Sequence, residues 1–189
     1  MRVEETAEAG EYGGFVERFE QQEAGARRLQ VGGSTRTELR DALHSRGVLL
    51  NAHAETLLDH AVFQLRGEEE IGIVERAVGD LELSAGATLP EVFAAAREHG
   101  LALCPPDTGP YLRLAMTSQA NAPDSVLSAG RSPAGALKVA AEPLSDDAQF
   151  PKGFYLRVVD GRQWLRGFRC DDEYRFSAED RFAFRLPVT

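Results

Sequence analysis

The chain has 189 residues, the length of one domain or of one domain with an extension. Hydrophobic residues make up 43% of the sequence and charged residues 27%, which excludes a wholly disordered chain, a collagen-like repeat and a disulfide-stabilised miniprotein. There are 30 acidic and 21 basic residues, so the formal net charge is −9. Because an acidic protein repels phosphate backbones and anionic membranes, general nucleic-acid binding and membrane binding are both disfavoured.

The sequence contains two cysteines, Cys104 and Cys170. Two are too few for a disulfide framework, and such a number is typical of a protein in a reducing compartment. The first residues lack the apolar stretch of a secretory signal, and no window approaches the ~20 apolar residues that a membrane helix needs. We therefore expect a cytoplasmic protein with no membrane partner.

Residues 1–33 are rich in Glu, Gly, Ala and Gln, and their hydrophobic residues are widely spaced. The pairs Gly13-Gly14 and Gly32-Gly33 interrupt any long pattern. This composition predicts a flexible, acidic N-terminal arm. Phe15 and Phe19 form a weak apolar face that allows a short helix from about residue 15 to residue 29.

Signals for regular structure begin at residue 34, and we expect a single α+β domain over residues 34–189. Thr35 and Glu38 have the spacing of a capping box, in which the hydroxyl and the carboxylate satisfy backbone N–H groups at the start of a helix. Thr88 and Glu91 repeat this spacing. The elements predicted in chain order are a helix over about 35–46, a helix over 51–63, a strand within 68–78 and a helix from 88 to 100.

Beyond residue 100 the pattern changes to short runs of strand-forming residues between clusters of Pro, Gly, Asp and Ser. Helices followed by such strands predict an α+β fold, with N-terminal helices and then a mainly antiparallel β-sheet. The expected strands are 110–116, 125–128, 137–142, 153–159, 162–169 and 181–186.

The strongest local signal is Asp160-Gly161, which lies between two of these strands. Both residues suit a type I′ turn, whose central positions take positive φ and whose twist matches a β-hairpin. A two-residue loop sets the register, so Val159 should face Arg162, Arg157 should face Trp164, and Tyr155 should face Arg166.

Alternation along the hairpin separates its side chains into two faces. The core face is expected to carry Phe154, Leu156, Val158, Leu165 and Gly167. The other face interleaves rings with guanidinium groups and includes the only tryptophan. Such a face can stack planar groups and pair anions, although arginine stems also cover rings merely to shield apolar area. The candidate ligand-binding residues are Tyr155, Arg157, Trp164, Arg166 and Phe168.

Signals for catalysis or metal binding are weak. Cys104 follows His99 by five residues, but nothing nearby indicates an activated thiol. His53 and His60 are two helical turns apart, without the further ligands that a zinc site needs. The sequence has no phosphate-binding loop, dinucleotide fingerprint or nucleophile elbow. We therefore expect no metal and no cofactor.

Several segments resemble an uncharacterised bacterial protein family that is sometimes labelled as helicase. The likeness runs through Gly100-Leu-Ala-Leu-Cys104-Pro, Gly109-Pro-Tyr-Leu-Arg-Leu114, Gly153-Phe-Tyr-Leu-Arg157, Trp164-Leu165 and Asp180-Arg-Phe-Ala-Phe184. It covers about residues 36–186 and implies a single structured unit. It brings no activity, and this sequence lacks the phosphate loop that a helicase requires.

Three functions remain open. The first, which we expect, is a non-enzymatic binding module whose aromatic and arginine face contacts an acidic protein segment or a small anionic ligand. The second is a small enzyme with a site between helices and sheet that involves Cys104 or His99. The third is single-stranded nucleic-acid binding, in which bases stack on the rings for roughly 1–3 kcal/mol each. Whether the protein forms a homodimer is also open.

Overall fold

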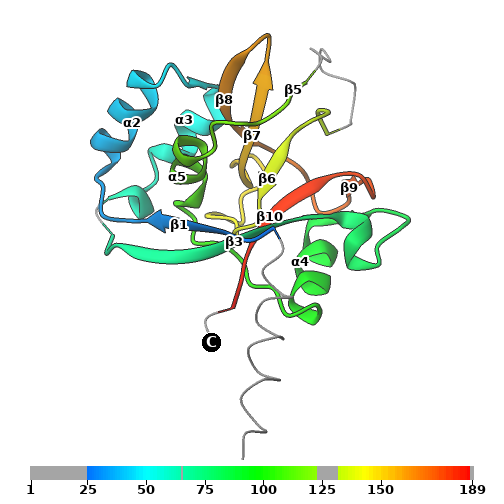
Figure 1. Cartoon of the computed structure of the whole chain (residues 1–189). Coiled ribbons are helices and arrows are strands. Elements are labelled where there is room, and N and C mark those ends of the chain that lie inside the picture. Colours follow the sequence, from blue (N-terminus) through cyan, green and yellow to red (C-terminus); the bar gives the residue numbers. More distant parts are fainter. Residues whose placement is uncertain (1–24, 65, 123–131, 188–189) are drawn as a thin grey trace, which may run out of the picture.

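The computed structural model describes residues 25–64, 66–122 and 132–187 (Figure 1). The expected strand at 125–128 and most of the expected N-terminal arm, including most of its short helix, lie outside these residues. Within them, the fold is α+β, as expected, with a mostly antiparallel sheet that curls around the molecule. No helix in the described part of the chain is long and apolar enough to span a bilayer.

One sheet contains eight strands, in the order β1-β3-β10-β6-β7-β8-β2, with β5 beside β7. Strands β10 and β6, β8 and β2, and β5 and β7 pair in parallel, whereas the other pairs are antiparallel. A second, two-stranded sheet pairs β4 with β9. The strands are β1 Arg27–Val31, β2 Leu49–Leu50, β3 Glu69–Ala77, β4 Ala87–Thr88, β5 Asn121–Ala122, β6 Leu137–Val139, β7 Gly153–Val159, β8 Arg162–Phe168, β9 Arg175–Phe176 and β10 Arg181–Arg185.

The described residues form four α-helices and two 3₁₀ helices: α2 Arg36–Ser45, α3 Ala52–Leu58, η1 Ala61–Phe63, η2 Val78–Leu81, α4 Leu89–Glu98 and α5 Thr108–Ala115. The first predicted capping box is present, because Glu38 accepts a hydrogen bond from the Thr35 backbone N–H at 2.7 Å and its own N–H donates to the Thr35 hydroxyl. The hydrogen bonds from Thr35 lower the pKa of the Glu38 carboxyl. The helix expected over 51–63 ends earlier, at Leu58, and η1 follows it.

The expected order of elements is wrong in one respect, because helices and strands alternate along the first half of the chain. Residues 27–31, which were assigned to the flexible arm, form β1 and pair with β3. Leu29 and Val31 are buried, while Arg28 is exposed and forms an ion pair with Glu70 at 3.2 Å. Apolar and polar residues alternate along this segment, but it forms a strand only by pairing with β3, which lies about 40 residues further along the chain.

The strand expected over 110–116 is also wrong, because these residues belong mostly to helix α5. Pro110 lies in the first turn, where its missing N–H costs no helical hydrogen bond. Gly109 allows the helix to approach β7, since a Cβ atom there would lie 2.7 Å from the ring of Phe154. Tyr111, Leu112 and Leu114 therefore lie in a helix that packs on the sheet, and not in a strand.

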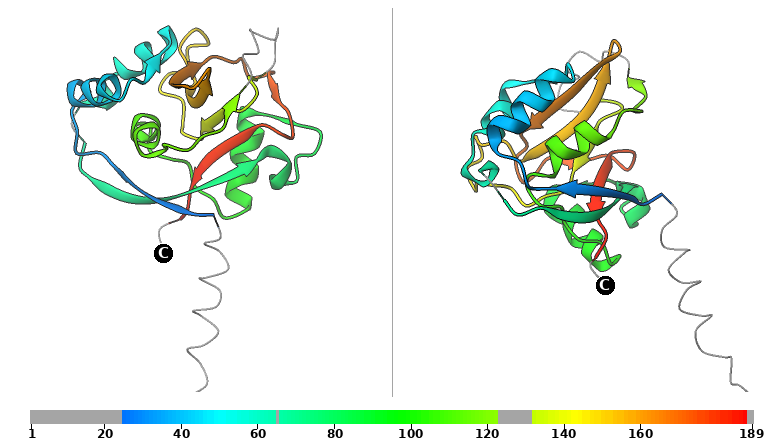
Figure 2. Two further views of the ribbon diagram at one scale, coloured as in Figure 1. Left: turned by 45° about the horizontal axis from the view of Figure 1, so that its top comes forward. Right: turned by 60° about the vertical axis from the view of Figure 1, so that its left-hand side comes forward.

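The sheet has a core on each face. Consecutive residues of β10 show this, because Ala183 joins one core whereas Phe182 and Phe184 join the other. The first core also contains residues of α2, α3 and α5, and the second contains residues of η2, α4 and β9. Figures 1 and 2 show α4 at the end of the molecule opposite α2 and α3. Both faces of the central strands are therefore covered.

Candidate functional site

The β7–β8 hairpin has the predicted register. Asp160 and Gly161 have φ values of 50° and 70°, as the type I′ turn requires. Tyr155 lies opposite Arg166, Arg157 opposite Trp164, and Val159 opposite Arg162. The five candidate residues therefore share one face of the hairpin, as expected.

Only part of this face is accessible, because two of the five residues are buried. Tyr155 is 7% exposed and Arg157 is 2% exposed, whereas Trp164, Arg166 and Phe168 are half-buried. The Tyr155 ring lies against the ring of Phe168, with 6.5 Å between their centroids, and Nε of Arg157 donates to the Ala134 carbonyl at 3.0 Å. Tyr155 and Arg157 are thus structural residues, and the accessible part of the face belongs to the other three residues.

A buried ion pair lies beside the part of this face that carries Tyr155. Lys138 lies opposite Tyr155 on β6, and it is 3% exposed. Its ammonium group donates to Asp180 at 2.8 Å and lies over the rings of Phe176 and Phe182, 5.3 and 5.4 Å from their centroids. Burial lowers the pKa of Lys138, although Asp180 opposes that shift. A buried, fully paired charge thus lies on the strand next to Tyr155.

Sequence reasoning missed Lys138. A signal for it exists, because Lys138 is the only charged residue in the apolar run Ala136–Ala141, and a buried charge in such a run needs a partner.

The part of the face that carries Trp164 and Arg166 lies beside β2, the terminal strand of the sheet. The Arg166 guanidinium stacks on the Trp164 ring, 4.0 Å from its centroid. Nε of Arg166 is buried and has no hydrogen-bond partner in the described part of the chain. Trp164 pairs with Leu49 of β2, and β2 is the terminal strand on this side. The half-buried Trp164 and Arg166 are therefore at an edge of the sheet, whereas Phe168 packs against Tyr155 and Phe176.

A hollow of about 360 Å³ lies along the same edge strand. Its walls are formed by α2, by residues 48–50 and by Glu55 of α3. Arg40 in this hollow forms ion pairs with Glu55 and Asp59, whereas His44 is exposed. The edge of β2 is thus flanked by the hollow and by the Trp164–Arg166 stack.

The residues of the alternative enzymatic site do not form a catalytic pair. Cys104 is buried, its thiol donates to the Ala183 carbonyl at 3.5 Å, and burial raises its pKa to about 12. The exposed His99 ring is engaged with the Ala95 carbonyl at 2.9 Å, at the end of α4. Because the thiolate is the nucleophile, this cysteine is disfavoured for nucleophilic chemistry.

The two histidines considered for metal binding have other surroundings. Nδ1 of His60 accepts a hydrogen bond from the Val62 N–H at 3.2 Å, which caps η1. The backbone of His53 lies close to Gly167 of β8. No cluster of three potential metal ligands occurs among the residues that the structure describes.

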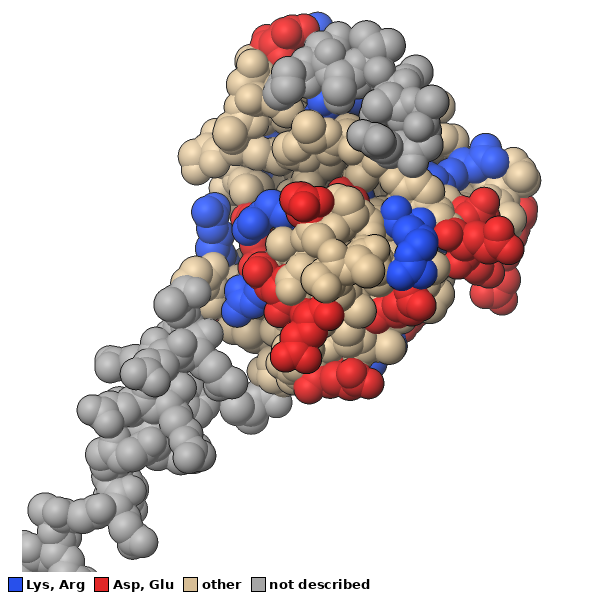
Figure 3. Space-filling view, turned by 90° about the vertical axis from the view of Figure 1, so that its right-hand side faces the viewer, with Lys and Arg blue, Asp and Glu red and all other residues tan. Residues whose placement is uncertain are grey.

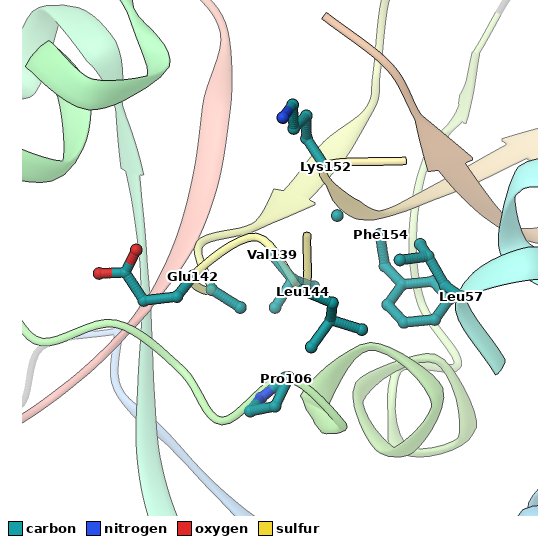
Figure 4. Close-up of a pocket in the computed structure, with 9 residues that line it drawn as sticks. Leu57, Pro106, Val139, Glu142, Leu144, Lys152 and Phe154 are labelled. Atoms are coloured by element: carbon teal, nitrogen blue, oxygen red, sulfur yellow. The ribbon is translucent and has the colours of Figure 1, made fainter. Parts of the chain in front are cut away.

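A second hollow, of about 280 Å³, lies between α4 and the segments around residues 142, 152 and 171. It shares Glu142 and Lys152 with a narrow apolar cavity of about 10 Å³, which is room for about one water molecule. In Figure 4 the charged ends of Glu142 and Lys152 point away from the apolar side chains Leu144 and Phe154. The charged ends of both side chains therefore lie away from the apolar cavity, and both residues also line the wider hollow.

Charge distinguishes the sides of the molecule. On the side that carries η2 and β9, acidic side chains predominate among interspersed basic ones (Figure 3). Asp80, Glu82 and Glu179 are exposed in these elements or beside them. An acidic partner is therefore disfavoured there.

The chain matches no family model, no curated protein and no solved structure. The resemblance to an uncharacterised bacterial family thus stays a prediction, and the function must be argued from the geometry.

Proposed function

We propose that this protein is a binding module that captures an acidic, extended polypeptide segment along the β2 edge of its sheet. The observation that carries this proposal is the Trp164–Arg166 stack beside the terminal strand. The two free cysteines, Cys104 and Cys170, support a reducing compartment such as the cytoplasm for this interaction.

The Arg166 guanidinium is prepared to pair an anion. Its planar group is held on the indole ring, so little conformational entropy is lost when it binds. Among the described residues, it forms no ion pair with a carboxylate. A carboxylate from a partner would therefore pair with Arg166 without displacing an internal one.

The terminal strand favours an extended segment over a small anion. A terminal strand has backbone N–H and C=O groups on its outer side, to which a peptide can add as a further strand. Leu49 and Leu50 are half-buried, so a partner would cover apolar surface there. Arg46 and Arg162 are exposed, Arg46 just before β2 and Arg162 in β8, and they extend the positive charge beyond Arg166.

The only tryptophan provides a direct test, because its fluorescence reports on this surface. We expect the peptide Ac-VEVEVE-NH₂ to change Trp164 emission at low salt, and we expect Ac-VKVKVK-NH₂ to leave it unchanged. Arg166→Gln should lower the affinity for the acidic peptide about tenfold. The control Arg181→Gln, at an exposed arginine of β10, should bind the peptide like the wild type.

Three results would contradict the proposal. Glutarate binding as tightly as the acidic peptide would indicate a small-anion site. An oligo-dT strand binding more tightly than the peptide would indicate a nucleic-acid site. Trp164→Ala/Arg166→Ala protein that is folded and still captures the peptide would show that this surface is not used.

A further inference from the structure

We propose that the hollow beside α4 is a second site, which binds a free α-amino acid with an apolar side chain. This site is separate from the β2 edge and independent of the peptide proposal. It rests on the size of the hollow, its apolar wall and the opposite charges among the residues that line it.

The size of the hollow suits a small metabolite. Its volume of about 280 Å³ lies just below the range of about 300–1,000 Å³ that is typical of sites for drug-sized ligands. Leu89, Pro90 and Phe93 provide one wall from the first turns of α4. Pro90 is exposed, whereas Leu89 and Phe93 are each 6% exposed, so an aliphatic or aromatic ligand side chain would bury apolar surface mainly on Pro90.

Two of the charged residues at the hollow already neutralise each other. Arg97 of α4 forms an ion pair with Glu142 on the opposite wall. Both side chains are more than half exposed, so this is a surface ion pair between two residues that line the hollow. It also holds the end of α4 against the segment that follows β6.

The remaining charges have opposite signs. Lys152 and Asp172 line the hollow, and neither side chain has a hydrogen bond or ion pair to another described residue. The Asp171 carboxylate, by contrast, accepts the backbone N–H groups of Glu173 and Tyr174 at 3.2 and 2.7 Å. The charges without an ionic partner at this hollow are thus one cation, Lys152, and two carboxylates, Asp171 and Asp172, of which only Asp172 also has no hydrogen bond.

The half-buried Cys170 lines the same hollow as these charged residues. Burial raises the pKa of its thiol, Lys152 opposes this shift, and Asp171 and Asp172 add to it. These three charged residues and the thiol all belong to the lining of the hollow. The thiol is neutral and provides a chemical reporter of occupancy.

A free amino acid matches this arrangement group for group. Its carboxylate pairs with the Lys152 ammonium, its ammonium pairs with the Asp172 carboxylate, and its side chain lies on Pro90 and on the accessible edges of Leu89 and Phe93. A simple carboxylate or a simple amine would leave one of the two charges unpaired. The charge pattern thus selects a zwitterion over either singly charged analogue.

Titration of the full chain, followed by amide chemical shifts, tests the site. We expect L-leucine and L-phenylalanine to shift amides of residues 89, 91–97, 142 and 170–172, and we expect glycine to bind at least tenfold more weakly. The analogues 4-methylpentanoate and 3-methylbutylamine should each bind about tenfold more weakly than L-leucine.

Matched variants test whether Lys152 and Asp172 pair with the charged groups of the amino acid. Lys152→Gln and Asp172→Asn should each weaken L-leucine binding about tenfold. The neighbouring variants Arg169→Gln and Glu173→Gln, at exposed residues outside the hollow, should bind like the wild type. Bound L-leucine should also slow alkylation of Cys170 by iodoacetamide.

Two outcomes would overturn the proposal. One is an absence of shifts at these amides with 20 mM of either amino acid while the protein is folded. The other is equal binding of L-leucine and either singly charged analogue. Because Trp164 is not among the residues that line this hollow, its fluorescence response to the acidic peptide distinguishes failure of this site from failure of the β2 edge.

Discussion

The side chain of Asn51 extends the short strand β2 by bonding to the backbone of Gly167 in β8. Its amide oxygen accepts the Gly167 N–H at 2.8 Å, and its amide nitrogen donates to the Gly167 carbonyl at 3.0 Å. The same oxygen accepts the Ala54 N–H at 2.9 Å and so caps α3. One side chain therefore joins a helix start, the terminal strand and the hairpin that carries Trp164.

We predict that Asn51→Ala lowers the free energy of unfolding by about 2 kcal/mol, because it removes a helix cap and two further hydrogen bonds. Urea denaturation measures this loss. Asn51→Asp keeps both accepted hydrogen bonds and should cost less. A midpoint for Asn51→Ala equal to that of the wild type would show that these bonds do not stabilise the edge.

Gly167 is required for the contact between α3 and β8. A Cβ atom there would lie 2.6 Å from the backbone carbon of His53 and 2.8 Å from the nitrogen of Ala54. Since backbone atoms cannot move aside as the end of a side chain can, we predict that Gly167→Ala costs about 1–3 kcal/mol. The control is Gly67→Ala, where a Cβ atom meets nothing within 4 Å. Equal thermal stability of the two variants would contradict this prediction.

The Lys138–Asp180 pair should behave as a coupled unit. Lys138→Met leaves Asp180 without its buried partner, and we predict a loss of about 3–5 kcal/mol. Lys138→Met/Asp180→Asn removes both charges and should recover most of this loss. A double-mutant cycle by chemical denaturation measures the coupling, and additive losses in the two single variants would exclude it.

The same pair predicts how stability depends on pH. Burial alone would raise the pKa of Asp180, but the attraction of Lys138 and hydrogen bonding hold it below its ordinary value. The ionised carboxylate therefore stabilises the fold fully above its unfolded pKa of about 4. This stabilisation is lost as the pH falls through the lowered, folded value. Unfolding curves between pH 5 and pH 2 should show a smaller acid loss for Asp180→Asn than for the wild type. Parallel losses would assign the acid sensitivity to other groups.

The two cysteines should differ in reactivity. Burial raises the pKa of the Cys104 thiol to about 12, while Cys170 is half-buried. We predict that iodoacetamide at pH 8 modifies Cys170 first and reaches Cys104 only when the protein unfolds. Mass spectrometry after increasing times measures both sites. Fast modification of Cys104 in the folded protein would restore it as a candidate nucleophile.

The features that the sequence predicted correctly depend on residues close together in the chain. Asp160 and Gly161 determine a turn, and the turn determines which residues face each other across the hairpin. Thr35 and Glu38 likewise form their capping box within a single helical turn. In both cases the backbone geometry of a few residues is sufficient, and no distant partner is needed.

Tertiary structure alone decided which of those residues a partner can reach. The pattern that placed Tyr155 and Arg157 on one face contains no information on what surrounds them. In the fold, Arg157 donates to the Ala134 carbonyl, and Tyr155 lies against Phe168 and opposite the buried Lys138. Strand β1 likewise required β3, and the position of β2 at the end of the sheet results from the order of strands. Local sequence thus determined register and facing, whereas burial depends on contacts between distant segments, which a local pattern does not encode.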